Sequence, residues 1–170
     1  MSVESLFLKY SVDKLTQYTA RIEICLGKLT EEQIWARGGS NENAVGNLAL
    51  HLAGNVGQWI VSALGDKPSA RDRDAEFAAR SGYAALQLVA VLRQTVDEAV
   101  QVISGLDTHS LTQTYQIQNY CVSGTEVVYH AVEHFSYHAG QIIFATKLFT
   151  GDDLNFYPHL QNAGTSEQAP

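Results

Sequence analysis

The stretch GTEVVYHAVEHFSYHAGQIIFATKLF, residues 124–149, decides the fold of this chain. Its apolar residues recur at helical spacing, which is typical of a long helix with one buried face. Three histidines, His130, His134 and His138, follow that same face, each four residues from the next, where leucines would be expected. Because burial of an imidazole is costly unless it finds a partner, the pattern indicates a metal ion or a buried hydrogen-bond network.

Length, composition and charge narrow the class of protein. The 170 residues, 45% of them apolar, fit one domain with a real core, and we expect a domain over residues 1–160 and a disordered tail over 161–170. No apolar run is as long as a membrane span and the first residues do not resemble a secretion signal, so we expect a cytoplasmic protein with no membrane partner. The 11 basic against 18 acidic side chains, a net charge of −7, argue against nucleic acid as a partner.

Helical periodicity also marks three earlier segments. Apolar residues at helical spacing predict helices over about residues 2–27, 43–64 and 81–104. Before the histidine helix, the pattern Ser-Gly-Thr-Glu over residues 123–126 matches a capping box, which predicts that this helix begins near Gly124.

The connections between these helices complete the predicted fold. Weak alternation over residues 112–121 predicts a short irregular or extended segment between the third and fourth helices. The charged stretch RDRDAEF, residues 71–77, is predicted to be a solvated loop or one weak turn, and we expect no chemistry there. The fold class is therefore predicted to be all-α, a four-helix bundle with one short extended segment.

A fourth histidine, His51, lies on the apolar stripe of the second predicted helix. Bundle cores build metal sites from side chains on facing helices, and two histidines four residues apart on one helix form a bidentate pair. His51 together with two of the three later histidines therefore predicts a metal site. The pairs His130/His134 and His134/His138 have the same spacing, so spacing leaves the choice between them open. A single core histidine is more often satisfied by hydrogen bonds, but the joint placement on two helices favours the metal.

Three nitrogen ligands without a fourth protein ligand leave one coordination position open, which is typical of a catalytic site. Neutral imidazole suits zinc, nickel, copper or iron(II). Three polar residues lie near the histidines in sequence: Asn47 and Asn55 stand one turn before and after His51, and Gln141 follows His138 by three residues. We expect them to orient the ligands or line a pocket, although hydrogen bonds to backbone or water are an equal alternative for the two asparagines.

Two motifs carry a family resemblance. NLALHLAGNVGQWI, residues 47–60, has a histidine in an Asn-Leu-x-x-His-Leu context, and EHFSYHAGQI, residues 133–142, has the form His-x-x-x-His-x-Gly-Gln. In this order they resemble the DinB/YfiT-like superfamily of metal-binding four-helix bundles. The resemblance implies His51, His134 and His138 as the metal ligands, with His130 as a neighbour. It also implies a homodimer and a divalent ion, nickel or zinc, with iron or manganese as alternatives.

The same resemblance suggests an activity, because the better-understood branches of the superfamily are transferases or isomerases that use low-molecular-weight thiols. We therefore expect a metal-dependent transferase acting on a small-molecule substrate, in which the ion lowers the pKa of a bound thiol or water. Hydrolysis by metal-bound water is one alternative. A non-catalytic bundle that binds metal or small ligands is the other, and a closed four-ligand site that includes His130 would favour it. No motif names the substrate.

Overall fold

The structure, a computed structural model, describes residues 2–158, so the predicted tail over residues 161–170 lies outside the described part. Within that part, no helix combines the length and apolar character needed to cross a membrane. The described residues form seven α-helices, one π-helical segment and one two-stranded sheet. In chain order the elements are α1 (Val3–Lys28), α2 (Glu31–Trp35), α3 (Val45–Val56), the π-helix η1 (Gly57–Ser62), α4 (Arg73–Ala78), α5 (Ala85–Ser104), α6 (Thr108–Thr112), β1 (Thr114–Ile117), β2 (Tyr120–Ser123) and α7 (Gly124–Thr150).

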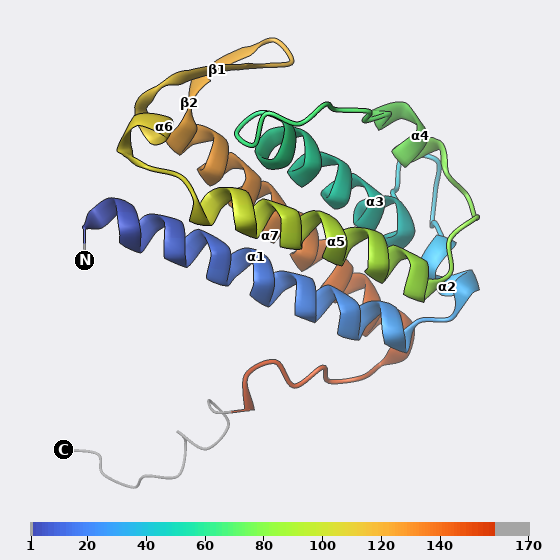
Figure 1. Ribbon diagram of the computed structural model, residues 1–170. Coiled ribbons are helices and arrows are strands. Elements are labelled where there is room, and N and C mark those ends of the chain that lie inside the picture. The colour runs from blue at the N-terminus through green and yellow to red at the C-terminus, as the bar shows by residue number, and fades with distance from the viewer. Residues whose placement is uncertain (1, 159–170) are drawn as a thin grey trace, which may run out of the picture.

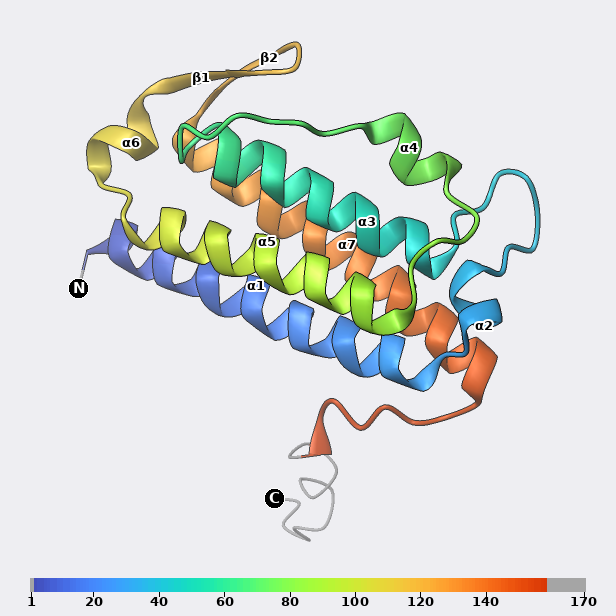
Figure 2. The same ribbon diagram turned by 45° about the vertical axis from the view of Figure 1, so that its right-hand side comes forward.

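The long helices run side by side and enclose the core (Figure 1). α1 packs against α5 and α7, and α3, which continues into η1, packs against the same two helices. Figure 2 shows this arrangement from a second direction, with α4 lying along α3. The predicted all-α class is thus confirmed as a mainly helical fold. The predicted count of four helices is not confirmed, because three short helices and a small sheet join the long ones.

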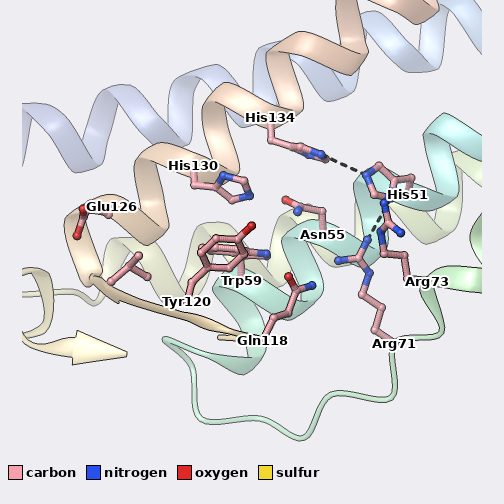
Figure 3. A pocket seen from close by; sticks show the side chains of 11 residues that line it. His51, Asn55, Trp59, Arg71, Arg73, Gln118, Tyr120, Glu126, His130 and His134 are labelled. Atoms are coloured by element: carbon pink, nitrogen blue, oxygen red, sulfur yellow. Dashed lines mark hydrogen bonds between the residues drawn. The ribbon is translucent and has the colours of Figure 1, made fainter. Parts of the chain in front are cut away.

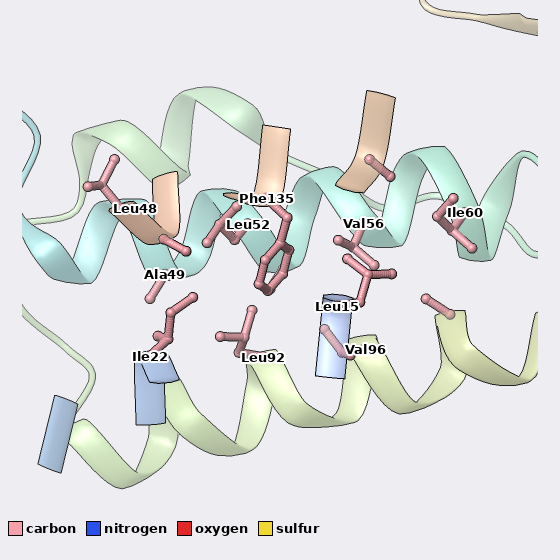
Figure 4. Packing of buried hydrophobic residues seen from close by; sticks show 14 of the residues in the cluster. Leu15, Ile22, Leu48, Ala49, Leu52, Val56, Ile60, Leu92, Val96 and Phe135 are labelled. Atoms are coloured by element: carbon pink, nitrogen blue, oxygen red, sulfur yellow. The ribbon is translucent and has the colours of Figure 1, made fainter. Parts of the chain in front are cut away.

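The core lies where the apolar faces of these helices meet. Phe135 of α7 is fully buried, and Figure 4 shows its ring among side chains that include Leu15 of α1, Leu52 of α3 and Leu92 of α5. Burial of each such side chain contributes about 1.5–3 kcal/mol to folding. The core therefore fixes α3 and α7 relative to each other, and these are the two helices that carry the histidines.

A capping box at its start and a left-handed glycine at its end define the length of α7. The Ser123 hydroxyl accepts from the Glu126 N–H, and the Glu126 carboxylate accepts from the Ser123 N–H at 2.7 Å, which confirms the predicted capping box. At the other end Gly151 has a φ of 69°, a left-handed conformation that glycine adopts without strain. Local sequence therefore determines both ends of the histidine helix.

The predicted extended segment before α7 is an antiparallel hairpin. β1 pairs with β2 in a register that places Thr114 opposite Ser123 and Ile117 opposite Tyr120. At the turn, Gln118 has a φ of 55°, and its side-chain amide donates to Oε1 of Gln58 at 2.9 Å. This bond ties the hairpin to η1, at the end of the helix that carries His51.

Candidate metal centre

Three histidines from two helices meet between α3 and α7. His51 is buried, with 5% of its surface exposed, whereas His134 and His138 are half-buried at the edge of the apolar face of α7. Their potential ligand atoms all lie within 4.8 Å of one another. In Figure 3, His134 and His51 point toward each other, and their Nε2 atoms are 3.2 Å apart. The structure thus brings together the three residues that the family resemblance selects.

The geometry of His51 and His134 fits a metal ion. Two nitrogen ligands at tetrahedral positions, each about 2.0–2.1 Å from zinc, lie about 3.3 Å apart, close to the observed 3.2 Å. Two facing imidazole nitrogens need either a proton or a cation between them. Among the described residues, Nδ1 of His134 is buried without a hydrogen-bond partner, so Nε2 is the nitrogen of this ring that has a polar neighbour. A donor set of three imidazoles is suited to zinc, nickel or iron(II).

Glu76 of α4 determines which nitrogen of His51 is free. Nδ1 of His51 lies 2.9 Å from Oε2 of Glu76, and because a carboxylate only accepts, Nδ1 carries the proton and Nε2 keeps its lone pair. Arg71 donates to both carboxylate oxygens, at 2.7 and 2.9 Å. Its Nη2 also lies 3.1 Å from Nδ1 of His51, but two donors form no hydrogen bond in this tautomer. A carboxylate behind a ligating histidine is the common arrangement in metal sites.

The pairing of Arg71 with Glu76 shows that the prediction for residues 71–77 was wrong. A solvated loop or one weak turn was expected, but residues 73–78 form the short helix α4, which packs on α3 and buries Glu76 to 9% exposure. Burial by itself raises the pKa of Glu76, but hydrogen bonds and charges from Arg71 and His51 outweigh it and hold the pKa below its ordinary value. The carboxylate is therefore ionised at neutral pH. Phe77, the one apolar residue besides alanine in this charged run, is the signal that could have indicated packing.

His138 is supported from within its own helix. Its Nδ1 lies 2.7 Å from Oε1 of Gln141, an acceptor, so Nδ1–H donates and Nε2 keeps the lone pair. Burial lowers the pKa of His138, although the bond to Gln141 partly offsets this effect. Burial, followed by the charges of His138 and His51, lowers the pKa of His134 to about 3. Both rings are therefore neutral at pH 7, as metal binding requires.

The two asparagines near His51 have different roles. Asn47 does not contact the ring, because its amide donates to the carbonyls of Glu76 and Ala79 at 2.8 and 2.9 Å and so holds α4 against α3. Asn55 is equally inaccessible, with 5% of its surface exposed, but its Oδ1 has no hydrogen-bond partner among the described residues. Of these two asparagines, only Asn55 therefore has an amide oxygen available to a ligand.

A pocket of about 380 Å³ opens beside the histidines (Figure 3). His51 and His134 line it, and His130 lies in its wall, where its ring packs on Trp59 with centroids 4.0 Å apart and planes tilted by 38°. His130 is outside the group of three, and burial lowers its pKa. The hairpin adds Tyr120 to the lining. This residue was not predicted, because it belongs to none of the helical patterns that carry the histidines.

Fold and site together define a mainly helical protein with a three-histidine cluster beside a pocket. The chain belongs to the family described as protein of unknown function (DUF1572), which matches residues 2–158. A search among curated proteins gave no match.

Two solved structures have a similar fold. A conserved protein from Enterococcus faecalis has a TM-score of 0.71 at 17% identity, over 89% of this chain and 99% of that chain. A DinB-like protein from Bacillus cereus has a TM-score of 0.65 at 16% identity, over 82% of this chain and 90% of that chain. These likenesses show the fold alone, and the second confirms the resemblance to DinB-like proteins at the level of the fold.

Proposed function

We propose that this protein is a metal-dependent enzyme built on a DinB-like four-helix bundle, with His51, His134 and His138 as the ligands of a divalent ion. The observation that carries the proposal is the meeting of three imidazoles beside a pocket whose lining includes two of them, His51 and His134. Three protein ligands leave a coordination position open to substrate. When bound, the ion would supply Lewis-acid activation of a thiol or a water.

Nickel or zinc is the proposed ion, with iron or manganese as alternatives. The support is the donor set, because imidazole nitrogens suit these metals better than they suit magnesium or calcium. Glu76 is not part of that set. Its carboxylate is occupied by His51 and Arg71, so its role is to hold His51 in the tautomer that presents Nε2.

The proposed reaction is transfer to or from a low-molecular-weight thiol. A pocket of about 380 Å³ holds a small molecule rather than a polymer, and the thiol comes from the family resemblance. Hydrolysis is the second candidate. The observation that favours it is the buried Oδ1 of Asn55, an acceptor without a partner among the described residues that a reacting water would satisfy.

The test is metal analysis of protein purified without a histidine tag. The variants His51→Ala, His134→Ala and His138→Ala should lose the metal, while His130→Ala, on the same helix and beside the same pocket, should retain it. A wild-type protein that binds no divalent ion on titration would overturn the proposal. For the metal-loaded protein, thiol-dependent turnover of a general electrophile supports transfer, whereas ester cleavage without thiol supports hydrolysis.

A further inference from the structure

Arg73, the first residue of α4, places a guanidinium in the pocket lining close to His51 (Figure 3). Its Cζ lies 4.9 Å from the centre of the Phe77 ring, and that ring lies 4.6 Å from the ring of His51. Among the described residues no carboxylate pairs with Arg73, whereas neighbouring Arg71 is bound to Glu76. Arg73 therefore presents a charged, forked donor to the pocket.

The other charges around the pocket are already compensated. Glu76 offsets the charge of Arg71, and the carboxylate of Glu126 accepts two hydrogen bonds of 2.7 Å from Ser123 at the start of α7, where the helix dipole favours a negative charge. A guanidinium in this position is suited to bind a carboxylate or a phosphate.

Asn55 provides a second, independent indication of a ligand. Its side chain is almost completely buried, and Oδ1 has no partner within the described part of the chain. Figure 3 shows the amide extending into the space between His134 and Gln118. A buried acceptor without a partner is unfavourable, so a ligand that donates a hydrogen bond here would remove that cost.

Aromatic rings form another part of the wall. The Trp59 ring lies 4.0 Å from the ring of His130 and 6.0 Å from the ring of Tyr120, measured between centroids. Tyr120 is exposed and comes from the hairpin, which Gln118 anchors to η1. Such a wall suits the apolar part of a small molecule.

We infer that the pocket binds a small organic anion, whose carboxylate or phosphate pairs with Arg73 while a hydroxyl or amide of the same molecule donates to Asn55. Its apolar part lies against Trp59 and Tyr120. The inference rests on the proposed function, because it names the charge class of that enzyme's substrate. Pairing with Arg73 nevertheless requires no metal, so the two can fail separately.

The experiment is calorimetric titration of the metal-free full-length protein with phenylacetate, phenyl phosphate and the neutral phenylacetamide. The anions should bind about tenfold or more tightly than the amide, as a charge-assisted pair predicts. Arg73→Gln should abolish this preference. Lys14→Gln removes the same charge from α1, away from the pocket, and should keep it. Whichever of the two anions binds more tightly then identifies carboxylate or phosphate as the preferred group.

A second comparison tests Asn55. Mandelate adds a hydroxyl to phenylacetate, so one of its enantiomers should bind the wild type more tightly than phenylacetate does, and Asn55→Leu should remove the difference. Equal affinity for phenylacetate and phenylacetamide, an anion preference that survives in Arg73→Gln, or no binding in the millimolar range would each overturn the inference. A failed metal analysis would leave this comparison intact, because it uses metal-free protein.

Discussion

Nδ1 of His51 lies 2.9 Å from Oε2 of Glu76, a contact between α3 and α4 that spans 25 residues of chain. It directs the Nε2 lone pair of His51 toward α7, where His134 and His138 lie. The orientation of one histidine of the cluster thus depends on a carboxylate from a short helix outside the long ones.

Glu76→Gln should therefore weaken metal binding although every histidine remains. The change removes the charge that stabilises the Nδ1–H tautomer and leaves Arg71 without its charged partner. Loss of such a supporting carboxylate typically costs about 10–100-fold in metal affinity. The measurement is competition for zinc and nickel against a chromogenic chelator. Glu133→Gln, an exposed carboxylate on α7, is the control and should bind like the wild type. Unchanged affinity in Glu76→Gln would contradict the positioning role.

Gly54→Ala should disrupt the same arrangement from the α3 side. A Cβ at this position would lie 1.9 Å from Oε1 of Glu76 and 2.9 Å from Nε of Arg71, so the ion pair must move. We expect a loss of about 1–3 kcal/mol in the free energy of unfolding, measured in urea, together with weaker metal binding.

Gly140→Ala is the matched control for this substitution. Its Cβ would meet nothing within 4 Å in the middle of α7, so alanine should stabilise the protein by about 0.5–1 kcal/mol. If Gly54→Ala raises the free energy of unfolding as Gly140→Ala does, the carboxylate of Glu76 does not lie against Gly54, and the prediction is contradicted.

Local patterns were enough to predict the histidine helix and the facing position of His51, but not which of the later histidines join the cluster. The capping box at Ser123 and the glycine at 151 act within a few residues, so the sequence predicts α7 almost to its ends. The apolar stripes of α3 and α7 are also local, and they place His51 and the later histidines on facing helices. The choice of His138 over His130 required the family resemblance, because both have the same spacing from His134.

Local patterns did not predict the residues that hold His51 in place. Glu76 and Arg71 are buried because α4 docks on α3, and this docking depends on the carbonyl bonds from Asn47 and on the space left by Gly54. Both conditions join positions far apart in the chain. A run of charges shows no helical apolar face, so it was interpreted as solvated. The hairpin residue Tyr120 reaches the pocket for a similar long-range reason, through the turn that Gln118 anchors.

Acidification should destabilise the metal-free protein. His134 has an ordinary pKa of 6.5 and a folded-state pKa of about 3, so between these values the unfolded chain binds a proton that the folded chain does not. The free energy of unfolding must then fall as the pH is lowered through this window. The lowered pKa values of His130 and His138 act in the same direction, and that of Glu76 adds to it in more acidic solution.

The measurement is the melting temperature of EDTA-treated protein from about pH 7 to about pH 4. It should decrease steadily, and His134→Leu should give a shallower decrease because one of the groups responsible is missing. A melting temperature that stays constant between neutral pH and about pH 5 would contradict the assignment.

Asn55→Leu should stabilise the metal-free, ligand-free protein. Leucine has nearly the same shape, and it removes a buried acceptor that has no partner among the described residues, a group that costs about 1–3 kcal/mol. Asn47→Leu is the matched control, because Asn47 is also buried on α3 but donates to the carbonyls of Glu76 and Ala79. Its loss should lower the free energy of unfolding by a similar amount, so urea denaturation should give opposite signs for the two variants. If both variants are destabilised, the Asn55 amide stabilises the ligand-free fold, and this outcome would contradict the prediction.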